Sequence, residues 1–98
     1  MTVSVETHDS QSCTATIVNR RGLHARAAAK FVKTVAQFKA RVLVSHRGTE
    51  VSGQSIMGLM MLAAAPGCTI DLSASGEDAG EALRALTTLI ADKFGEED

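Results

Sequence analysis

Apolar and polar side chains alternate in three stretches of the chain, and this two-residue period predicts β-strands. The stretches are QSCTATIV (11–18), RVLVSH (41–46) and CTIDLSA (68–74). Each places its apolar residues mainly on one side, as expected of a strand that is buried on a single face. The turn that follows the second stretch ends in Gly48, which tolerates a positive φ, so we expect a tight hairpin to a short strand at residues 49–52.

Three further stretches have the period of a helix. The first starts at or just after His24, and its apolar residues recur at i, i+3, i+4 and i+7: Ala28, Phe31, Val32 and Val35. The second is the apolar run IMGLMML (56–62), for which Ser55 is the expected N-cap. The third follows Gly76, with Asp78 or a neighbour as its cap. Its predicted buried stripe consists of Ala82, Leu83, Leu86, Leu89 and Ile90.

The predicted order is therefore strand, helix, strand, strand, helix, strand, helix. Because each strand is apolar on one face only, we expect an antiparallel sheet with helices on a single side, which is an α+β fold. A doubly wound parallel sheet would need strands that are apolar on both faces. We expect a flexible N-terminal extension at residues 1–10, a single domain at residues 11–94 and an acidic C-terminal tail at residues 95–98.

The composition fits one small domain. The chain has 98 residues, of which 45% are hydrophobic, and no run approaches the roughly 20 apolar residues that a membrane span needs. The first residues lack the features of a secretory signal, so we expect a cytoplasmic protein without membrane insertion. Cys13 and Cys68 have no metal-type spacing. Reduced thiols are the commoner state for such a pair, and a cross-strand disulfide is the alternative. We expect no metal and no cofactor.

The charges are unevenly distributed along the chain. Residues 19–41 contain seven of the ten basic residues and no acid, while the last 22 residues contain seven of the eleven acids. This predicts an electropositive region around His24, although a solvated basic helix face is also common. We do not expect nucleic-acid binding, because three Phe without Tyr or Trp offer little stacking surface and the net charge is −1.

His24 is the first candidate for chemistry. A histidine is a poor choice for a cap, since Ser, Thr, Asp and Asn satisfy the open amides better. Those amides and the helix dipole favour an anion and keep the ring neutral, and a neutral imidazole is a nucleophile. Arg26 could place a guanidinium beside a phosphate carried on the ring. An ordinary surface histidine is the alternative.

Two other features raise the same kind of question. The Ser55 hydroxyl is either a helix cap or a site whose phosphorylation would change the charge of the surface. Methionines at helical spacing are more often core than interface, but the stretch 56–62 is apolar nearly all round. Met57, Met60 and Met61 could therefore form an adaptable docking patch.

Two motifs with the full element order match a known family. GLHARAAAKFV (22–32) resembles the active-site segment of HPr, the histidine-containing phosphocarrier of the bacterial phosphoenolpyruvate-dependent phosphotransferase system, and QSIMGLMMLAAAPG (54–67) resembles its regulatory-serine segment. The resemblance runs from about Cys13 to Phe94. It implies an open-faced β-sandwich, with four antiparallel strands and three helices on one face.

The resemblance also implies roles for particular residues. His24 would accept a phosphoryl group on Nδ1 from phosphorylated enzyme I and pass it to an enzyme IIA domain, so the protein would be a carrier and not an enzyme. Arg26 would pair with the phosphate, and the backbone amides of Ala25 and Arg26 would bind it. Ser55 would be the site of HPr kinase/phosphorylase. Partners would dock on Arg26, Ile56, Met57 and Met60, with the protein acting as a monomer.

The sequence departs from the family pattern at two positions. Ala27 stands where the family usually has proline, and Gln54 where a basic residue is frequent. Proline would preset φ in the first helical turn, so Ala27 bears on the rigidity of that turn. Such variants suit family members that serve a regulatory phosphorelay without a sugar permease as the end point. The resemblance as a whole leaves both sugar transport and a regulatory phosphorelay open. A regulatory module that uses Ser55 alone, with His24 inactive, is the second hypothesis.

Overall fold

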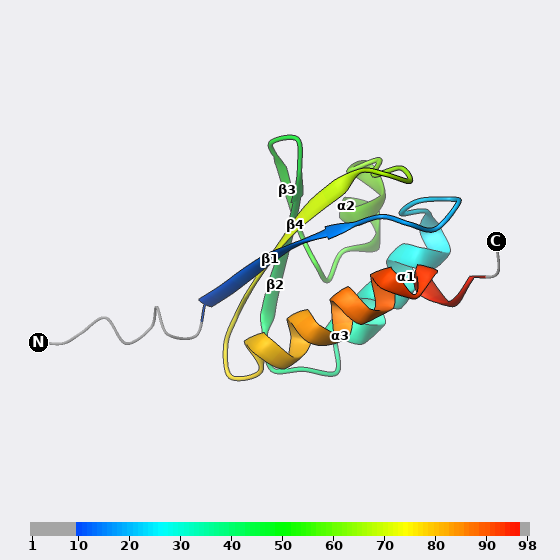
Figure 1. The fold of residues 1–98 in the computed structure, drawn as a ribbon. Helices are drawn as coiled ribbons and strands as arrows, with labels where there is room; N and C mark the ends of the chain where they lie inside the picture. The colour runs from blue at the N-terminus through cyan, green and yellow to red at the C-terminus, as the bar shows by residue number, and fades with distance from the viewer. Residues whose placement is uncertain (1–9, 97–98) are drawn as a thin grey trace, which may run out of the picture.

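The computed structural model describes residues 10–96 (Figure 1). Its elements confirm the predicted order, with one short 3-10 helix added at the end. They are β1 (Ser10–Thr16), α1 (Ala25–Val35), β2 (Arg41–His46), β3 (Thr49–Ser52), α2 (Ile56–Met61), β4 (Thr69–Ser75), α3 (Ala79–Ala91) and η2 (Lys93–Gly95). Residues 1–9 of the predicted extension and residues 97–98 of the predicted tail lie outside the described residues.

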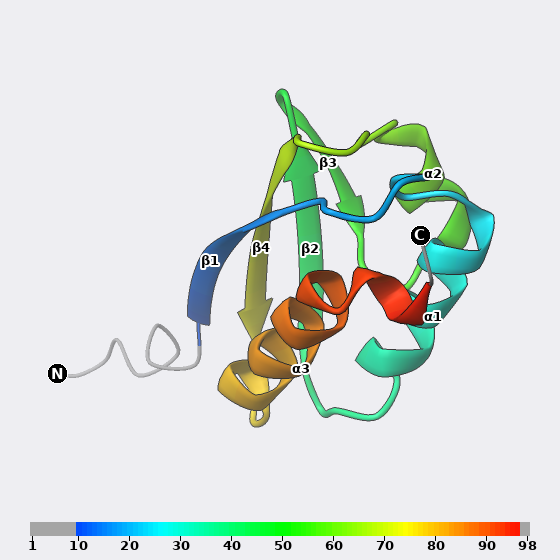
Figure 2. The ribbon, with the colours of Figure 1, turned by 45° about the vertical axis from the view of Figure 1, so that its right-hand side comes forward.

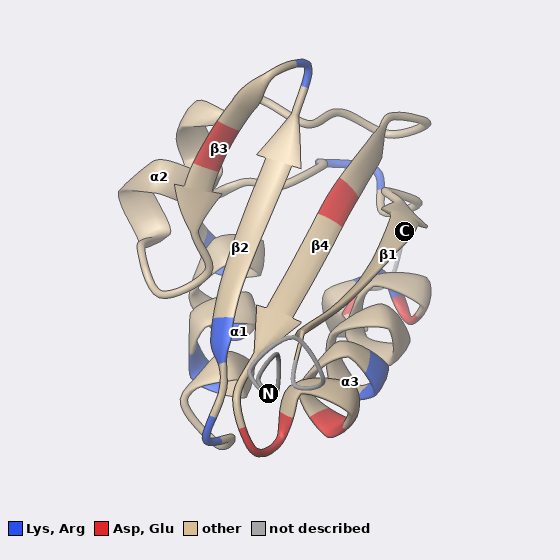
Figure 3. Ribbon diagram, turned by 90° about the vertical axis from the view of Figure 1, so that its left-hand side faces the viewer, with Lys and Arg blue, Asp and Glu red and all other residues tan. Residues whose placement is uncertain are grey.

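The four strands form one sheet in the order β1-β4-β2-β3, and every neighbouring pair is antiparallel. The helices lie behind one face of this sheet, and the other face is left open (Figure 3). This confirms the α+β, open-faced architecture. The inner face is apolar because alternate strand positions point into the core: Val42, Val44, Ile70, Leu72 and Ala74 are all buried.

Helices α1 and α3 supply the other half of the core. Ala28, Phe31 and Val35 are buried as the helical period predicts, and Val32 is only partly buried. In α3 the predicted stripe is also confirmed, with Leu89 at its partly exposed margin. Phe94 lies one turn beyond α3 and is 1% exposed. The core therefore extends past the last predicted helix into η2.

The hairpin between β2 and β3 confirms the expected turn. Arg47 has φ 51° and Gly48 has φ 86°, the two left-handed positions of a type I′ turn. Asp78 is the N-cap residue of α3, as expected, but its side chain makes no hydrogen bond to the start of that helix. Asp78 Oδ2 instead accepts a hydrogen bond from the Lys39 backbone N–H at 2.7 Å. Tertiary packing thus uses this carboxylate to hold the segment before β2.

The loop between β1 and α1 approaches the segment after α2 very closely. Leu23 N donates to Ala64 O at 3.0 Å, and a Cβ added to Gly22 would lie 2.5 Å from the same oxygen. Gly22 also has φ 70°, a conformation that L-residues with a Cβ adopt at a cost. Only glycine fits here, and the contact fixes the position of the residues that precede α1.

We predict that Gly22→Ala destabilises the protein more than Gly67→Ala does. Both glycines have positive φ, but a Cβ at Gly67 would meet nothing within 4 Å. Gly67→Ala should lower the free energy of unfolding by about 1–2 kcal/mol through backbone strain alone. Gly22→Ala should lower it by roughly 1–3 kcal/mol more, because the Ala64 carbonyl must move. Urea unfolding measures both, and equal losses would contradict the close approach.

Candidate functional site

His24 is the N-cap residue of α1. Its backbone is extended (φ −83°, ψ −178°), and its Nδ1 accepts a hydrogen bond from the Arg26 backbone N–H at 3.3 Å. The predicted helix start is confirmed, and the ring caps the helix in spite of its low intrinsic preference for that position. An acceptor atom carries a lone pair, so Nδ1 is the unprotonated nitrogen of the ring.

The other ring nitrogen faces a carboxylate. Nε2 of His24 forms a hydrogen bond with Oε2 of Glu96. A carboxylate can only accept, so the proton of the neutral ring is assigned to Nε2. The two contacts of the ring therefore agree on one tautomer, with N–H at Nε2 and the lone pair at Nδ1. The side chains of His24 and Glu96 are 23% and 13% exposed, so both are partly shielded from solvent.

Asn19 connects this pair to the loop before α1. It is fully buried, and its Nδ2 donates to Gly22 O at 2.8 Å and to Glu96 Oε1 at 3.0 Å. Its Oδ1 is buried without a hydrogen-bond partner among the described residues. A buried acceptor without a partner costs about 1–3 kcal/mol. This cost is offset in part by the two hydrogen bonds of Nδ2, which connect the Gly22 turn to the Glu96 carboxylate.

The electrostatics of the site favour an ionised Glu96. Burial raises the pKa of its carboxyl, but hydrogen bonds from His24 and Asn19 lower it. The positive charge of Arg21 lowers it further, as does that of the His24 ring when it is protonated, so that the pKa of Glu96 lies below its ordinary value. The region around His24, which the sequence predicts to be electropositive, thus contains the Glu96 carboxylate, hydrogen-bonded to the ring.

Residues of η2 deliver Glu96 to this place. Phe94 is buried and has φ 55°, and Gly95 has φ 76°, so the chain turns sharply after α3. The Nζ of Lys30, on α1, donates to the Phe94 carbonyl at 2.6 Å. The buried Phe94 ring and the hydrogen bond from Lys30 therefore fix the position of the chain just before Glu96.

The site also contains three residues that the sequence did not predict: Asn19, Lys30 and Glu96. The uneven charge distribution was the available signal, since an acid-rich end and a basic segment attract one another. It could not single out one acid, because Glu96 lies 72 positions from His24 along the chain.

The structure also places the residues of the expected phosphate site. Ala25 and Arg26 form the first exposed positions of α1, directly after His24. Ala27, which occupies the family's usual proline position, is completely buried beneath the same turn. The side chain of Ala27 therefore faces the core and takes no part in the exposed surface around the ring.

Ser55 is the N-cap of α2, as predicted. Its Oγ accepts a hydrogen bond from Gly58 N at 2.9 Å. In the chain order the site of Ser55 and that of His24 are far apart, but the contact between Leu23 and Ala64 brings the end of α2 beside the start of α1 (Figure 2).

Helix α2 exposes its methionines. Ile56 is 40% exposed, Met57 70%, Met60 40% and Met61 75%, whereas Leu59 is fully buried. The commoner interpretation of such methionines as core residues was therefore wrong here, and one leucine anchors the helix instead. We call these four exposed residues the α2 patch. Met61, which the helical spacing placed in a docking patch but the family resemblance did not include, is the most exposed of the four.

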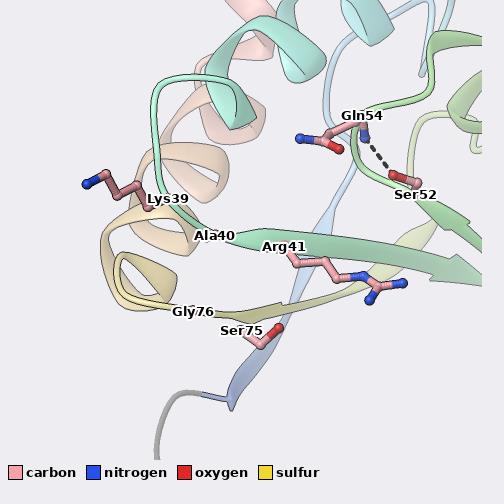
Figure 4. A pocket seen from close by; sticks show the side chains of 7 residues that line it. All are labelled: Lys39, Ala40, Arg41, Ser52, Gln54, Ser75 and Gly76. Atoms are coloured by element: carbon pink, nitrogen blue, oxygen red, sulfur yellow. Dashed lines mark hydrogen bonds between the residues drawn. The ribbon is translucent and has the colours of Figure 1, made fainter.

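A surface hollow lies at the end of the sheet where β2 begins and β4 ends (Figure 4). It has a volume of about 600 Å³ and is lined by Lys39, Ala40, Arg41, Ser52, Gln54, Ser75 and Gly76. The side chains of Lys39 and Arg41 point in different directions (Figure 4), so their charges do not converge on one point. This hollow shares no residue with the surroundings of His24.

Several further features bear on the expectations from sequence. Cys13 and Cys68 are both free thiols, so the disulfide alternative is excluded. Within residues 10–96, no group of three or more His, Cys, Asp or Glu side chains is arranged to hold a metal ion.

None of the helices in the described part of the chain is long and apolar enough to cross a membrane.

Comparison with known proteins identifies the same segment. The sequence model of the family described as "PTS HPr component phosphorylation site" matches residues 11–92. The phosphocarrier protein HPr of Neisseria meningitidis is 56% identical over 80 residues, which are 82% of this chain and 90% of that protein. The phosphocarrier protein HPr of Cupriavidus necator is 49% identical over 81 residues, or 83% of this chain and 91% of that protein.

Solved structures give the same result for the fold. The crystal structure of HPr-C-His from Thermoanaerobacter tengcongensis superposes with a TM-score of 0.85 at 44% sequence identity. It covers 90% of this chain and 99% of that one.

We predict that the Glu96 contact contributes stability only at higher pH. Because the pKa of Glu96 is lowered from 4.5 on folding, its contribution is complete above pH 4.5 and is lost as the pH falls through the lower folded-state value. Glu96→Gln should therefore be less stable than the wild type near neutral pH, and the difference should shrink in strong acid. Urea unfolding of both proteins, once near neutral pH and once in strong acid, measures this difference. Glu50→Gln, the same change on the open face, is the control and should show no such convergence.

Proposed function

Because this chain belongs to the HPr family of phosphocarrier proteins of the phosphotransferase system, we propose that His24 is its phosphoryl acceptor and donor. The single observation that carries the assignment is the pair of contacts that the ring makes: the Arg26 N–H lies at Nδ1 and the Glu96 carboxylate lies at Nε2. These contacts fit a neutral ring with the lone pair on Nδ1 and the proton on Nε2. This is the form in which imidazole attacks through Nδ1.

The transfer itself needs little more than positioning. The Nδ1 lone pair attacks phosphorus, and the bond from phosphorus to the donor group breaks, with its electron pair leaving on the donor. No proton has to move at Nδ1, because the proton of the ring is already on Nε2. The product is an Nδ1-phosphorylated ring with an N–H at Nε2. Transfer to an acceptor reverses these changes and restores the neutral imidazole.

The backbone at the start of α1 is suited to hold the carried phosphate. Before transfer, the Arg26 N–H is bonded to the Nδ1 lone pair. Once that lone pair forms the bond to phosphorus, the N–H needs a new acceptor, and phosphoryl oxygens lie next to it. The neighbouring Ala25 amide and the Arg26 guanidinium can bind the remaining oxygens. These groups stabilise the charge that develops during transfer.

The α2 patch and Arg26 fit the role of a docking surface for enzyme I and for enzyme IIA domains. The patch is apolar and exposed, and the Leu23–Ala64 hydrogen bond brings the end of α2 beside the start of α1. Methionine side chains adapt to different surfaces, which suits partners that must bind in turn and leave again. In this scheme the protein is a cytoplasmic monomer that serves sugar transport or a regulatory phosphorelay.

Ser55 is proposed as a regulatory site for HPr kinase/phosphorylase. Its hydroxyl caps α2 directly before the α2 patch. A phosphate there would add roughly −1.5 to −2 charges at the edge of an apolar docking surface and would weaken partner binding. If Ser55 acts alone, labelling would yield only acid-stable phosphoserine made from ATP, and no phosphohistidine.

We predict that the protein takes up one acid-labile phosphoryl group from phosphoenolpyruvate in the presence of enzyme I. His24→Ala should abolish this uptake, because the other histidine of residues 10–96, His46, lies in a strand and not at the start of a helix. His46→Ala is the matched control and should be labelled normally, since His46 lies in β2 with its Nδ1 at the Thr69 carbonyl. Normal uptake by His24→Ala would reject the proposal.

We predict that Arg26→Ala slows phosphoryl transfer by about 10- to 100-fold through loss of charge stabilisation. The fold should be nearly unchanged, because Arg26 is exposed in the first turn of α1. Rapid-quench measurement of labelling gives the rate, and Arg84→Ala, which removes an exposed arginine from α3, is the control. A large loss of thermal stability with a normal rate would contradict this role.

A further inference from the structure

We infer that Glu96 is a positioning residue that fixes the tautomer of His24 and keeps Nε2 protonated while the ring carries its phosphoryl group. The inference rests on the proposed function of His24 and adds a residue to it. The family match ends at residue 92, so Glu96 lies beyond the segment by which the chain is assigned to the family.

The first step of the inference is geometric. Glu96 is held at three points, since the Phe94 carbonyl is bonded to Lys30, Phe94 is buried, and Oε1 accepts from Asn19. Its second oxygen, Oε2, is thereby presented to Nε2 of His24. A carboxylate behind a histidine in this way selects the tautomer and orients the ring, as in metal sites where a second-shell carboxylate holds the ligand.

The second step concerns the phosphorylated ring. With phosphorus on Nδ1 and a proton on Nε2, the ring is cationic, and Glu96 then faces an N–H of increased acidity. Breaking the N–P bond returns the electron pair to Nδ1 and leaves a neutral imidazole, which is a good leaving group. If Nε2 had lost its proton, the leaving group would be an imidazolate anion, which is far poorer. By stabilising the proton on Nε2 of His24, Glu96 keeps the ring a good leaving group, so the phosphoryl group stays transferable.

The charges around the pair are consistent with this function. Glu96 faces His24, Asn19 and Arg21, and Lys30 of α1 is bonded to the carbonyl two residues earlier. The lowered pKa of Glu96 means that the carboxylate stays ionised throughout the neutral range, so it is always available to the ring.

The test compares the wild type, Glu96→Gln and Glu50→Gln in three measurements. Ring ¹⁵N chemical shifts of His24 in the unphosphorylated protein report the tautomer. Rapid-quench labelling with enzyme I and phosphoenolpyruvate reports transfer. Hydrolysis of the isolated phosphoprotein across the pH range reports the protonation of Nε2. Glu96 follows the last helical element, so its replacement leaves every helix and strand in place.

We expect Glu96→Gln to lose the single-tautomer signature, to transfer roughly tenfold more slowly, and to shift the pH profile of hydrolysis to lower pH. Glu50→Gln should match the wild type in all three. Unchanged shifts and an unchanged hydrolysis profile in Glu96→Gln would overturn the inference, and so would faster transfer, which would mark the contact as an obstruction.

The outcomes separate this inference from the proposed function. If the wild type accepts label and Glu96→Gln behaves identically, the carrier function stands and the role of Glu96 falls. If the wild type accepts no label at all, the carrier function falls. The ¹⁵N shifts then still decide whether Glu96 sets the tautomer, because they are recorded before any transfer.

Discussion

The inner face of the sheet has to be covered, and the helices that cover it bring the site together. Val42, Val44 and Leu72 make this face apolar, while the opposite face is polar and stays open (Figure 3). Helices that pack on this sheet bury apolar area only against its inner face. Phe31 of α1 and Phe94 of η2 both enter the same layer. The start of α1 and the end of the α3 segment therefore lie close together, and His24 sits between them.

The ring of His24 is held from two directions by groups with different origins. The Arg26 amide, which bonds to Nδ1, belongs to the same helix and would be present in any helix that starts at this position. The Glu96 carboxylate, which bonds to Nε2, arrives from the far end of the chain. The two contacts fit a neutral ring with its lone pair on Nδ1 and its proton on Nε2. That is the form which the proposed phosphoryl transfer requires.

The elements themselves could be predicted from the sequence because their causes are local. The alternation in 41–46, the helical period from Ala28 to Val35 and the glycine in the hairpin turn each act over a few residues. Asp78 is the N-cap residue of α3 as predicted, but its carboxylate accepts a hydrogen bond from a tertiary partner, the Lys39 backbone N–H, and not from the helix. The methionines of α2 gave no local clue to their exposure, since the choice of which side of an apolar helix is buried depends on the sheet edge it meets.

The sequence by itself determined the order of strands and helices, the one-sided sheet, and the histidine with its arginine at a helix start, because periodicity and capping depend on neighbouring residues. Only the tertiary structure decided that Glu96 and Asn19 belong to the site and that η2 is part of the core. The physical reason is that a hydrogen bond between residues 72 positions apart exists only after the core has packed. The pinning of the chain by Phe94 and Lys30, which no local pattern encodes, then sets where that carboxylate lies.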